Sequence, residues 1–209
     1  ADPLGLDQFT HQKGRELSYI NETDMHRLLQ TVTHIAAGFE VNFGTVPAIA
    51  VGVKHGNACG AGVAETAVEA VQKMLEGDEI AIFGGVVMVN GVIDADVATA
   101  LMQHHMPEGQ NRLLDGVVGS EVTPEAMENL SRAKLRIVTN PTLASLTAAS
   151  LETAAIYRNV RGGMLVQPNY TFVADLQADY IERHGSVTPQ QERDLIQAWA
   201  VGSTSNSNT

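Results

Sequence analysis

Apolar and polar positions along the chain follow two alternating spacings, which predict helices and strands in turn. Helices are predicted over residues 25–39, 64–75, 94–105, 124–133 and 189–201. Short apolar runs predict strands over residues 47–53, 80–89, 114–118, 135–138, 154–158 and 164–167. This alternation is typical of an α/β fold, in which helices cover a sheet.

Polar residues and glycines mark the ends of these segments. Thr23 or Asp24 can cap the first helix, and Gly38 can help to end it. Residues 1–21 have no regular pattern and are predicted as an extended or looped segment, and residues 202–209 as a polar tail. No linker-like stretch divides the chain, so residues 1–209 are interpreted as a single lobe.

Composition and charge narrow the classes of function. The chain has 209 residues, of which 44% are hydrophobic, and a net charge of −11. That charge opposes binding to nucleic acid or to an anionic membrane, and it opposes anionic metabolites unless their site is locally basic. One cysteine, no signal-like N-terminus and no apolar run near the ~20 residues of a membrane span predict a cytoplasmic protein.

The stretch from Val51 to Gly62 holds the strongest candidate chemistry. A buried strand is expected to end at Val53, and a helix to begin at about Ala64. Between them, Lys54 supplies a fixed charge, His55 can move a proton near neutral pH, and glycines before a helix start can cradle an anion. The alternative is an ordinary Lys-His pair on a surface loop.

Other candidates are weaker when each is taken alone. Phe83-Gly84-Gly85 and Gly162-Gly163 are glycine turns, for which a β-bulge and a hairpin are the structural alternatives. Cys59 has no identifiable base and is predicted to pack in the core. His104 and His105, as neighbours on a helix, are expected to point about 100° apart and not to chelate, so no metal is expected.

Several short motifs occur in one order across nearly the whole chain. They occupy residues 11–12, 14–21, 54–60, 78–85 with Asn90, 134–136, 162–167, 194–199 and 206–209. Examples are Lys54-His55-Gly56-Asn57-Ala58-Cys59-Gly60 and Gly162-Gly163-Met164-Leu165-Val166-Gln167. Taken together, the motifs resemble the formyl-transfer region of the AICAR transformylase/IMP cyclohydrolase family of purine biosynthesis.

The resemblance implies a fold, a reaction and a set of site residues. The fold is a three-layer α/β/α lobe with a mixed sheet of cytidine-deaminase-like type. The reaction is transfer of a formyl group from 10-formyltetrahydrofolate to the amine of AICAR or a related aminoimidazole. The implied catalytic residues are Lys54, His55 and Asn208. The implied substrate-binding residues are Asn57, Gly60, Phe83, Gly84, Gly85, Gln167 and Ser207.

The chain also departs from the family pattern. Residues 5–10 stand where the family has a phosphate-contacting arginine, which predicts weak nucleotide binding by this chain alone. The family continues into a second lobe, so a homodimer or a complex with a separate second-lobe subunit is expected. The alternative function is a non-catalytic binding or assembly protein that kept the scaffold.

Overall fold

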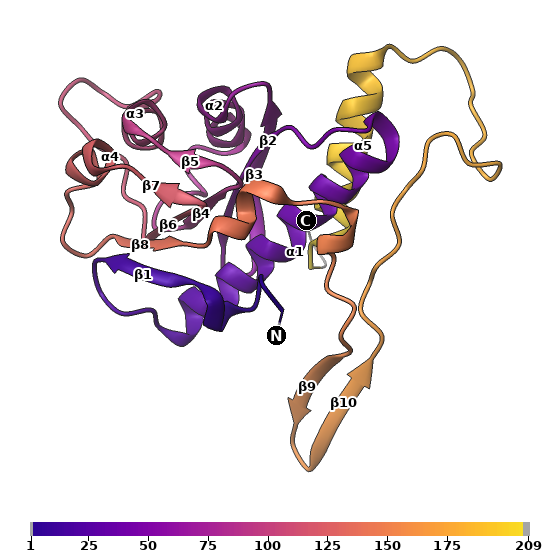
Figure 1. Ribbon diagram of the computed structural model, residues 1–209, viewed down its shortest axis with the longest axis horizontal. Helices are drawn as coiled ribbons and strands as arrows, with labels where there is room; N and C mark the ends of the chain where they lie inside the picture. The colour runs from indigo at the N-terminus through magenta and orange to yellow at the C-terminus, as the bar shows by residue number, and fades with distance from the viewer. Residues whose placement is uncertain (1, 207–209) are drawn as a thin grey trace.

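The computed structural model describes residues 2–206. A six-stranded mixed sheet lies at the centre of the molecule (Figure 1). Its order is β1-β8-β6-β4-β2-β3. β4, β6 and β8 are parallel, β1 is antiparallel to β8, and β2 is antiparallel to both β3 and β4. The strands are β1 (Thr10–Lys13), β2 (Ala48–Lys54), β3 (Asn57–Ala64), β4 (Val86–Val89), β6 (Gly116–Gly119) and β8 (Arg136–Thr139).

Helices lie on both faces of this sheet, and two small ribbons complete the described structure (Figure 1). The helices are α1 (Tyr19–Phe43), α2 (Ala67–Gly77), α3 (Ala95–Gln103), α4 (Pro124–Asn129) and α5 (Pro189–Thr204). The short 3₁₀ helices are η1 (Leu6–Gln8), η2 (Pro141–Ser145) and η3 (Ala148–Ser150). β5 (Val92–Ile93) pairs with β7 (Glu121–Val122), and β9 (Ile156–Val160) pairs with β10 (Gly163–Gln167). None of the helices within residues 2–206 is long and apolar enough to cross a membrane.

Alternate residues of each strand point to opposite faces, and this builds two cores. In β4, Val87 and Val89 belong to the core under α2, α3 and α4. Val86 and Met88 belong to the core under α1 and α5. All four side chains are buried, as expected of a strand that is covered on both sides. The predicted α/β class with a mixed sheet is therefore confirmed, with helices on both faces.

Helix α1 is longer at both ends than its apolar pattern predicts. It begins at Tyr19 because Ser18 and Asn21 form a reciprocal cap, which moves the start into the segment predicted as extended. It passes through Gly38 and ends before Gly44, which has a φ of 71°. A Cβ at Gly38 would lie 2.7 Å from the Ile196 side chain, so this glycine allows α5 to pack closely instead of ending α1.

The predicted glycine loop before α2 is wrong. Residues 57–64 form strand β3, and α2 begins at Ala67 after the Thr66 cap. A Cβ at Gly60 would lie 2.0 Å from the Met74 carbonyl oxygen, and one at Gly62 would lie 2.1 Å from that of Ala70. These glycines therefore let the helix backbone approach the sheet, and no anion cradle forms at this helix start.

Three smaller expectations also fail. Residues 80–85 are a turn rather than the start of a strand, because the Asp78 carboxylate accepts hydrogen bonds from the backbone amides of Ile80 and Ala81. Helix α5 continues to Thr204, into the segment predicted as a tail. Helix α3 ends at Gln103, so His104 and His105 are not helical neighbours, and their rings stack with centroids 4.0 Å apart.

One region projects from the layered body. We call residues 151–187 the arm; it contains the β9–β10 hairpin and the long loop that leads to α5 (Figure 1). None of its residues is buried. The predicted hairpin around Gly162-Gly163 is confirmed, with Gly162 at a φ of 84°.

Candidate functional site

The Lys54-His55 pair lies at the tip of the β2–β3 hairpin. Lys54 pairs with Asn57 in the ladder, and the two intervening residues, His55 and Gly56, have φ values of 54° and 80°. Positive φ at both positions is the geometry of a type I′ turn. Positive φ is unfavourable for a residue with a side chain, so surrounding contacts must hold this turn. One of them is the Asp24 carboxylate of α1, which accepts a hydrogen bond from the Gly56 amide at 2.8 Å.

The C-terminal end of the described chain is fastened to the same turn. The Asn206 backbone amide donates to the Asn57 side chain at 3.0 Å, and the Asn206 side-chain amide donates to the Gly56 carbonyl. Arg27 of α1 donates to the Asn206 side-chain oxygen at 2.7 Å. The structure therefore brings the motif at residues 54–60 together with Asn206, the first residue of the last motif. Ser207 and Asn208, two of the predicted site residues, lie outside the described residues.

Beside this turn lies a cavity of about 760 Å³, a volume in the usual range for a small-molecule site. Its walls come from α1, the hairpin tip and the arm: Ile20, Thr23, Asp24, His26, Arg27, Gln30, His55, Gly56, Ile156, Arg158, Leu165, Val166 and Gln167. In the β9–β10 hairpin of the arm, Arg158 pairs with Leu165 and Ile156 pairs with Gln167, so these four residues share one face of that hairpin. The cavity thus joins two predicted site residues, His55 and Gln167, across 112 positions of sequence.

Basic groups predominate in this cavity although the chain as a whole is acidic. The arginines Arg27 and Arg158 and the imidazoles of His26 and His55 line it, against one carboxylate from Asp24. This carboxylate is already engaged by the hairpin turn. The cavity is therefore the locally basic place that an anionic ligand of a chain with net charge −11 requires.

Sequence reasoning missed most of the α1 side of this cavity. Thr23, Arg27 and Gln30 recur at a spacing of three or four residues, so they share one polar stripe of the helix. This stripe was a usable signal, since it faces away from the buried Met25 and Leu28. Arg158 gave no such signal, because its neighbours in the sequence are those of an ordinary exposed strand.

Lys54 points away from the cavity and joins two predicted site segments. Its ammonium group donates a 2.5 Å hydrogen bond to the Phe83 carbonyl and lies 5.8 Å from the centroid of that ring. Gly84 has a φ of 72° and donates to the Leu113 carbonyl, and Gly85 donates to the Ile82 carbonyl. The predicted residues therefore form two groups, one around His55 and one around Lys54 and Phe83, that meet at the hairpin tip.

Cys59 and Gly60 lie on the side of β3 that faces α2. Val53 pairs with Ala58 and Gly52 with Gly60, so Cys59 is the extra residue of a bulge. Cys59 is partly buried and packs against the core under α2. Burial raises the pKa of its thiol, and the nearby Lys54 charge only partly offsets this. A raised thiol pKa disfavours the thiolate, which agrees with the predicted packing role.

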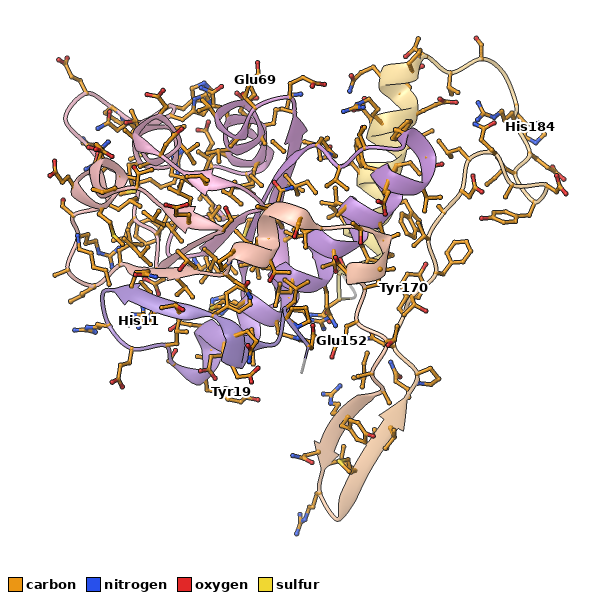
Figure 2. All side chains as sticks on the ribbon, in the orientation of Figure 1. His11, Tyr19, Glu69, Glu152, Tyr170 and His184 are labelled. Carbon is orange, nitrogen blue, oxygen red and sulfur yellow. The ribbon has the colours of Figure 1, made fainter. Side chains whose placement is uncertain are left out.

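The root of the arm is attached to α1 through buried polar groups. Nδ1 of His34 lies 2.7 Å from the Gln30 carbonyl oxygen, and Nε2 lies 3.1 Å from the Tyr170 carbonyl oxygen. Figure 2 labels Tyr170 at the root of the loop that follows the hairpin, and its ring stacks on His34 at 5.7 Å. Burial lowers the pKa of His34, against the opposing effect of the two carbonyls. This attachment holds the root of the arm against α1, on the side where Arg158 and Gln167 line the cavity.

Comparison with known proteins places this chain in a family. A family model described as "AICARFT/IMPCHase bienzyme" matches residues 2–209. The bifunctional purine biosynthesis protein PurH of Anoxybacillus flavithermus is 31% identical over 202 residues, which cover 96% of this chain and 35% of that protein. PurH of Synechococcus sp. strain WH7803 is 36% identical over 193 residues, which cover 90% of this chain and 34% of that protein.

The chain spans about a third of the length of these relatives. Among solved structures, Acinetobacter baumannii RibD, form 2, is similar at a TM-score of 0.38 and 17% identity, over 60% of this chain and 38% of RibD. A likeness that small carries no argument, whereas the family match extends over the whole described chain. The chain therefore belongs to the AICARFT/IMPCHase bienzyme family.

Proposed function

We propose that the cavity beside the β2–β3 hairpin is part of a formyltransferase site and that His55 is its proton carrier. The observation that carries the proposal is the position of His55, held at a turn tip on the wall of a basic cavity of about 760 Å³. The relatives described above are named for purine biosynthesis, and this directs the choice of substrate toward AICAR or a related aminoimidazole.

The proposed chemistry needs a base near the acceptor amine. The amine of an aminoimidazole is a poor nucleophile because its lone pair is delocalised into the ring. As the amine attacks the formyl carbon, an imidazole can take its proton and return one to the departing nitrogen of the donor. 10-Formyltetrahydrofolate would supply the formyl group. A histidine suits both transfers because it titrates near neutral pH.

Other residues would orient and stabilise the reacting groups. Lys54 is the proposed electrostatic partner of His55, with its ammonium group fixed by the Phe83 carbonyl. Asn208 is the proposed donor to the developing oxyanion, and Ser207 a substrate contact. Asn206, which precedes them, is bonded to the hairpin turn.

Binding of the acceptor would rest on charge and on exposed rings. Arg27 and Arg158 both line the cavity and could neutralise a phosphate, in place of the arginine that residues 5–10 lack. The Phe83 ring, which is 58% exposed, and the backbone of Gly84-Gly85 offer a surface for a planar ligand. The proposed binding set is completed by Asn57, Gly60 and Gln167. Gly60 packs against α2, so it would contribute only through the position of its backbone.

The arm suggests how the site is completed. On the β9–β10 hairpin, Tyr157 and Met164 lie outside the cavity lining and are 63% and 54% exposed. An isolated two-stranded ribbon is marginal in water, so an apolar outer face of this kind favours a protein partner. We propose that this partner is a second lobe of the same family, because the relatives are about three times as long as this chain.

The proposal includes a cellular setting and a finer description of the fold. We assign the sheet to the cytidine-deaminase-like type and the reaction to the cytoplasm, in agreement with the acidic composition and the single cysteine. The second candidate function is a non-catalytic binding or assembly role, which the missing arginine in residues 5–10 favours.

Formyl transfer by this chain mixed with a second-lobe polypeptide tests the proposal. His55→Ala should reduce turnover by at least ~10²-fold, the lower end of a general acid–base contribution. The matched control is His184→Ala, since His184 lies in the exposed part of the arm (Figure 2). Near wild-type turnover in His55→Ala would remove this residue from the role. An inactive wild-type assembly that still binds AICAR would favour the non-catalytic alternative.

Light scattering separates the possible assemblies. We expect the chain to form a complex when the second-lobe polypeptide is added. A homodimer of this chain alone would show that a second copy covers the arm. A monodisperse monomer that transfers formyl groups unaided would contradict the proposed need for a partner.

A further inference from the structure

Two histidines and two carboxylates meet where α2 and α3 end, away from the hairpin tip. The Nε2 atom of His104 lies 3.1 Å from a carboxylate oxygen of Glu76, which is in the last turn of α2. The Nδ1 atom of His105 contacts a carboxylate oxygen of Glu79 at 2.5 Å. The two imidazole rings are stacked with their centroids 4.0 Å apart.

The backbone that follows α3 brings these rings together. His104 caps the helix with φ −57° and ψ 124°, and His105 adopts a positive φ of 55°. The guanidinium group of Arg112, a buried residue, donates from both terminal nitrogens to the His104 carbonyl oxygen at 3.3 and 2.9 Å. The fold therefore sets the backbone positions of the two histidines, and the contacts with Glu76 and Glu79 orient the rings.

The electrostatic surroundings favour a cation between these groups. The C-terminal end of a helix carries partial negative charge, and here two such ends lie beside the carboxylates of Glu76 and Glu79. Carboxylates are unfavourable at this end of a helix unless positive charge compensates them. Arg112 faces the same region, but its terminal nitrogens are directed to a backbone carbonyl.

We propose that Glu76, His104 and His105 bind a divalent transition-metal ion of the zinc class. Each residue offers one ligand atom, and these atoms all lie within 4.8 Å of one another. Two imidazoles and one carboxylate are a donor set that suits Zn²⁺, with the fourth position left to water. Tetrahedral ligand atoms at ~2.1 Å from zinc are roughly 3.4 Å apart. Glu76 and His104 are already 3.1 Å apart, so the remaining adjustment falls on His105, whose exposed ring would turn out of its stack with His104 to direct a nitrogen at the ion.

Glu79 would act through His105 rather than on the metal. It holds Nδ1 of His105, which leaves Nε2 as the ligand nitrogen. A carboxylate behind a metal-binding imidazole fixes the ring and strengthens it as a ligand. Ligands from two helix ends would join α2 to α3, so the ion would act as a structural clamp.

Titration of Zn²⁺ into the purified, tag-free chain at neutral pH tests the site by calorimetry. We expect one ion per chain and a higher melting temperature in Zn²⁺ than in chelator. Separate His104→Ala and His105→Ala variants should weaken binding more than ~100-fold, because each loses a ligand. Glu79→Gln should weaken it by roughly 10–100-fold, the usual cost of losing such a supporting group.

His184→Ala is the control, since this exposed histidine also has a carboxylate neighbour, Glu182, at 3.5 Å. Its binding should equal that of the wild type. Melting temperatures in chelator establish that each variant is folded. Absence of sub-millimolar binding by the wild type would overturn the site. Unchanged binding in both His104→Ala and His105→Ala would also overturn it, since the ion would then bind elsewhere.

Discussion

The layered body and the arm contain the same kinds of apolar residues, but only the body buries them. All four residues of β4 are buried, whereas all five of β10, including Met164, Leu165 and Val166, are exposed. β4 is richer in valine than β10, but both segments form strands, so the difference in burial lies in what covers them. Helices cover both faces of β4, whereas β9 and β10 form a separate two-stranded sheet whose residues pair only with each other. The comparison shows that strand-forming sequence specifies a strand without specifying a core.

The candidate site lies where these two regions meet. The body supplies His55 from a rigid hairpin, and the arm supplies Arg158 and Gln167. Catalytic chemistry is thus proposed for the region with the greater local stability, and ligand contacts for the region with the lesser. This division is useful because an arm without a core can adjust to a ligand or to a partner.

The largest expected difference between the regions is in the cost of removing a leucine side chain. Leu28 is 0% exposed and Leu165 is 59% exposed. Leu28→Ala should lower the free energy of unfolding by about 2–5 kcal/mol, because it removes core contacts and leaves a cavity. Leu165→Ala should change it by less than about 0.5 kcal/mol. Urea unfolding of the isolated chain measures both, and equal losses would show that the arm has a core of its own.

Glycine substitutions sharpen the same contrast at a smaller magnitude. Gly60→Ala places a methyl group against the Met74 carbonyl of α2, while nothing lies within 4 Å of a Cβ at Gly163. We expect Gly60→Ala to lower the free energy of unfolding by about 1–3 kcal/mol through overpacking, and Gly163→Ala to leave it nearly unchanged. Thermal unfolding of the two variants is the measurement. A neutral Gly60→Ala would contradict the packing role and reopen a role in ligand binding.

Arginine substitutions test whether the arm contributes to the cavity. Arg158 lines it, and Arg161, in the same hairpin, does not. AICAR should bind weakly to the chain alone, and Arg158→Ala should weaken that binding by about tenfold, or ~1.4 kcal/mol, through loss of a phosphate contact. Titration calorimetry compares it with Arg161→Ala, which should match the wild type. Identical affinities in both variants would exclude the hairpin from anion binding.

The smallest expected effect is a pH dependence at the root of the arm. Burial lowers the pKa of His34, so the unfolded chain binds more protons than the folded chain as this residue titrates. The free energy of unfolding should therefore fall as pH drops through the ordinary histidine pKa of about 6.5, and should be retained above it. Unfolding between pH 5 and pH 8 in the wild type and in His34→Gln measures the contribution. An identical pH profile in the two proteins would contradict it.

The sequence was most informative where local chemistry decides structure. Thr188 caps α5, the Thr123-Pro124 pair starts α4, and Gly162 turns the arm hairpin, as their residue types predict. Each of these features depends on hydrogen bonds or dihedral angles within a few residues. The family motifs likewise predicted membership correctly, because they need only order and residue type.

Prediction failed where distant contacts decide. Gly60 and Gly62 suggested a loop before a helix, but they are strand residues, and α2 lies so close to them that there is no room for a side chain. His104 and His105 were expected to diverge on a helix, but Arg112, Glu76 and Glu79 hold them in a turn that stacks their rings. Neither arrangement could be deduced from spacing, since the partners that enforce it are brought near only by the fold.

By itself, the sequence determined the alternation of helices and strands, the acidic charge, the family and the candidate pair Lys54-His55. These depend on composition, periodicity and motif order. The tertiary structure alone decided that His55 lines a basic cavity with Arg27 and Arg158, while Lys54 turns toward Phe83. The physical reason is that a hairpin tip offers neighbouring side chains opposite directions. Only packing against α1, the arm and the residue 80–85 turn determines which group each side chain meets.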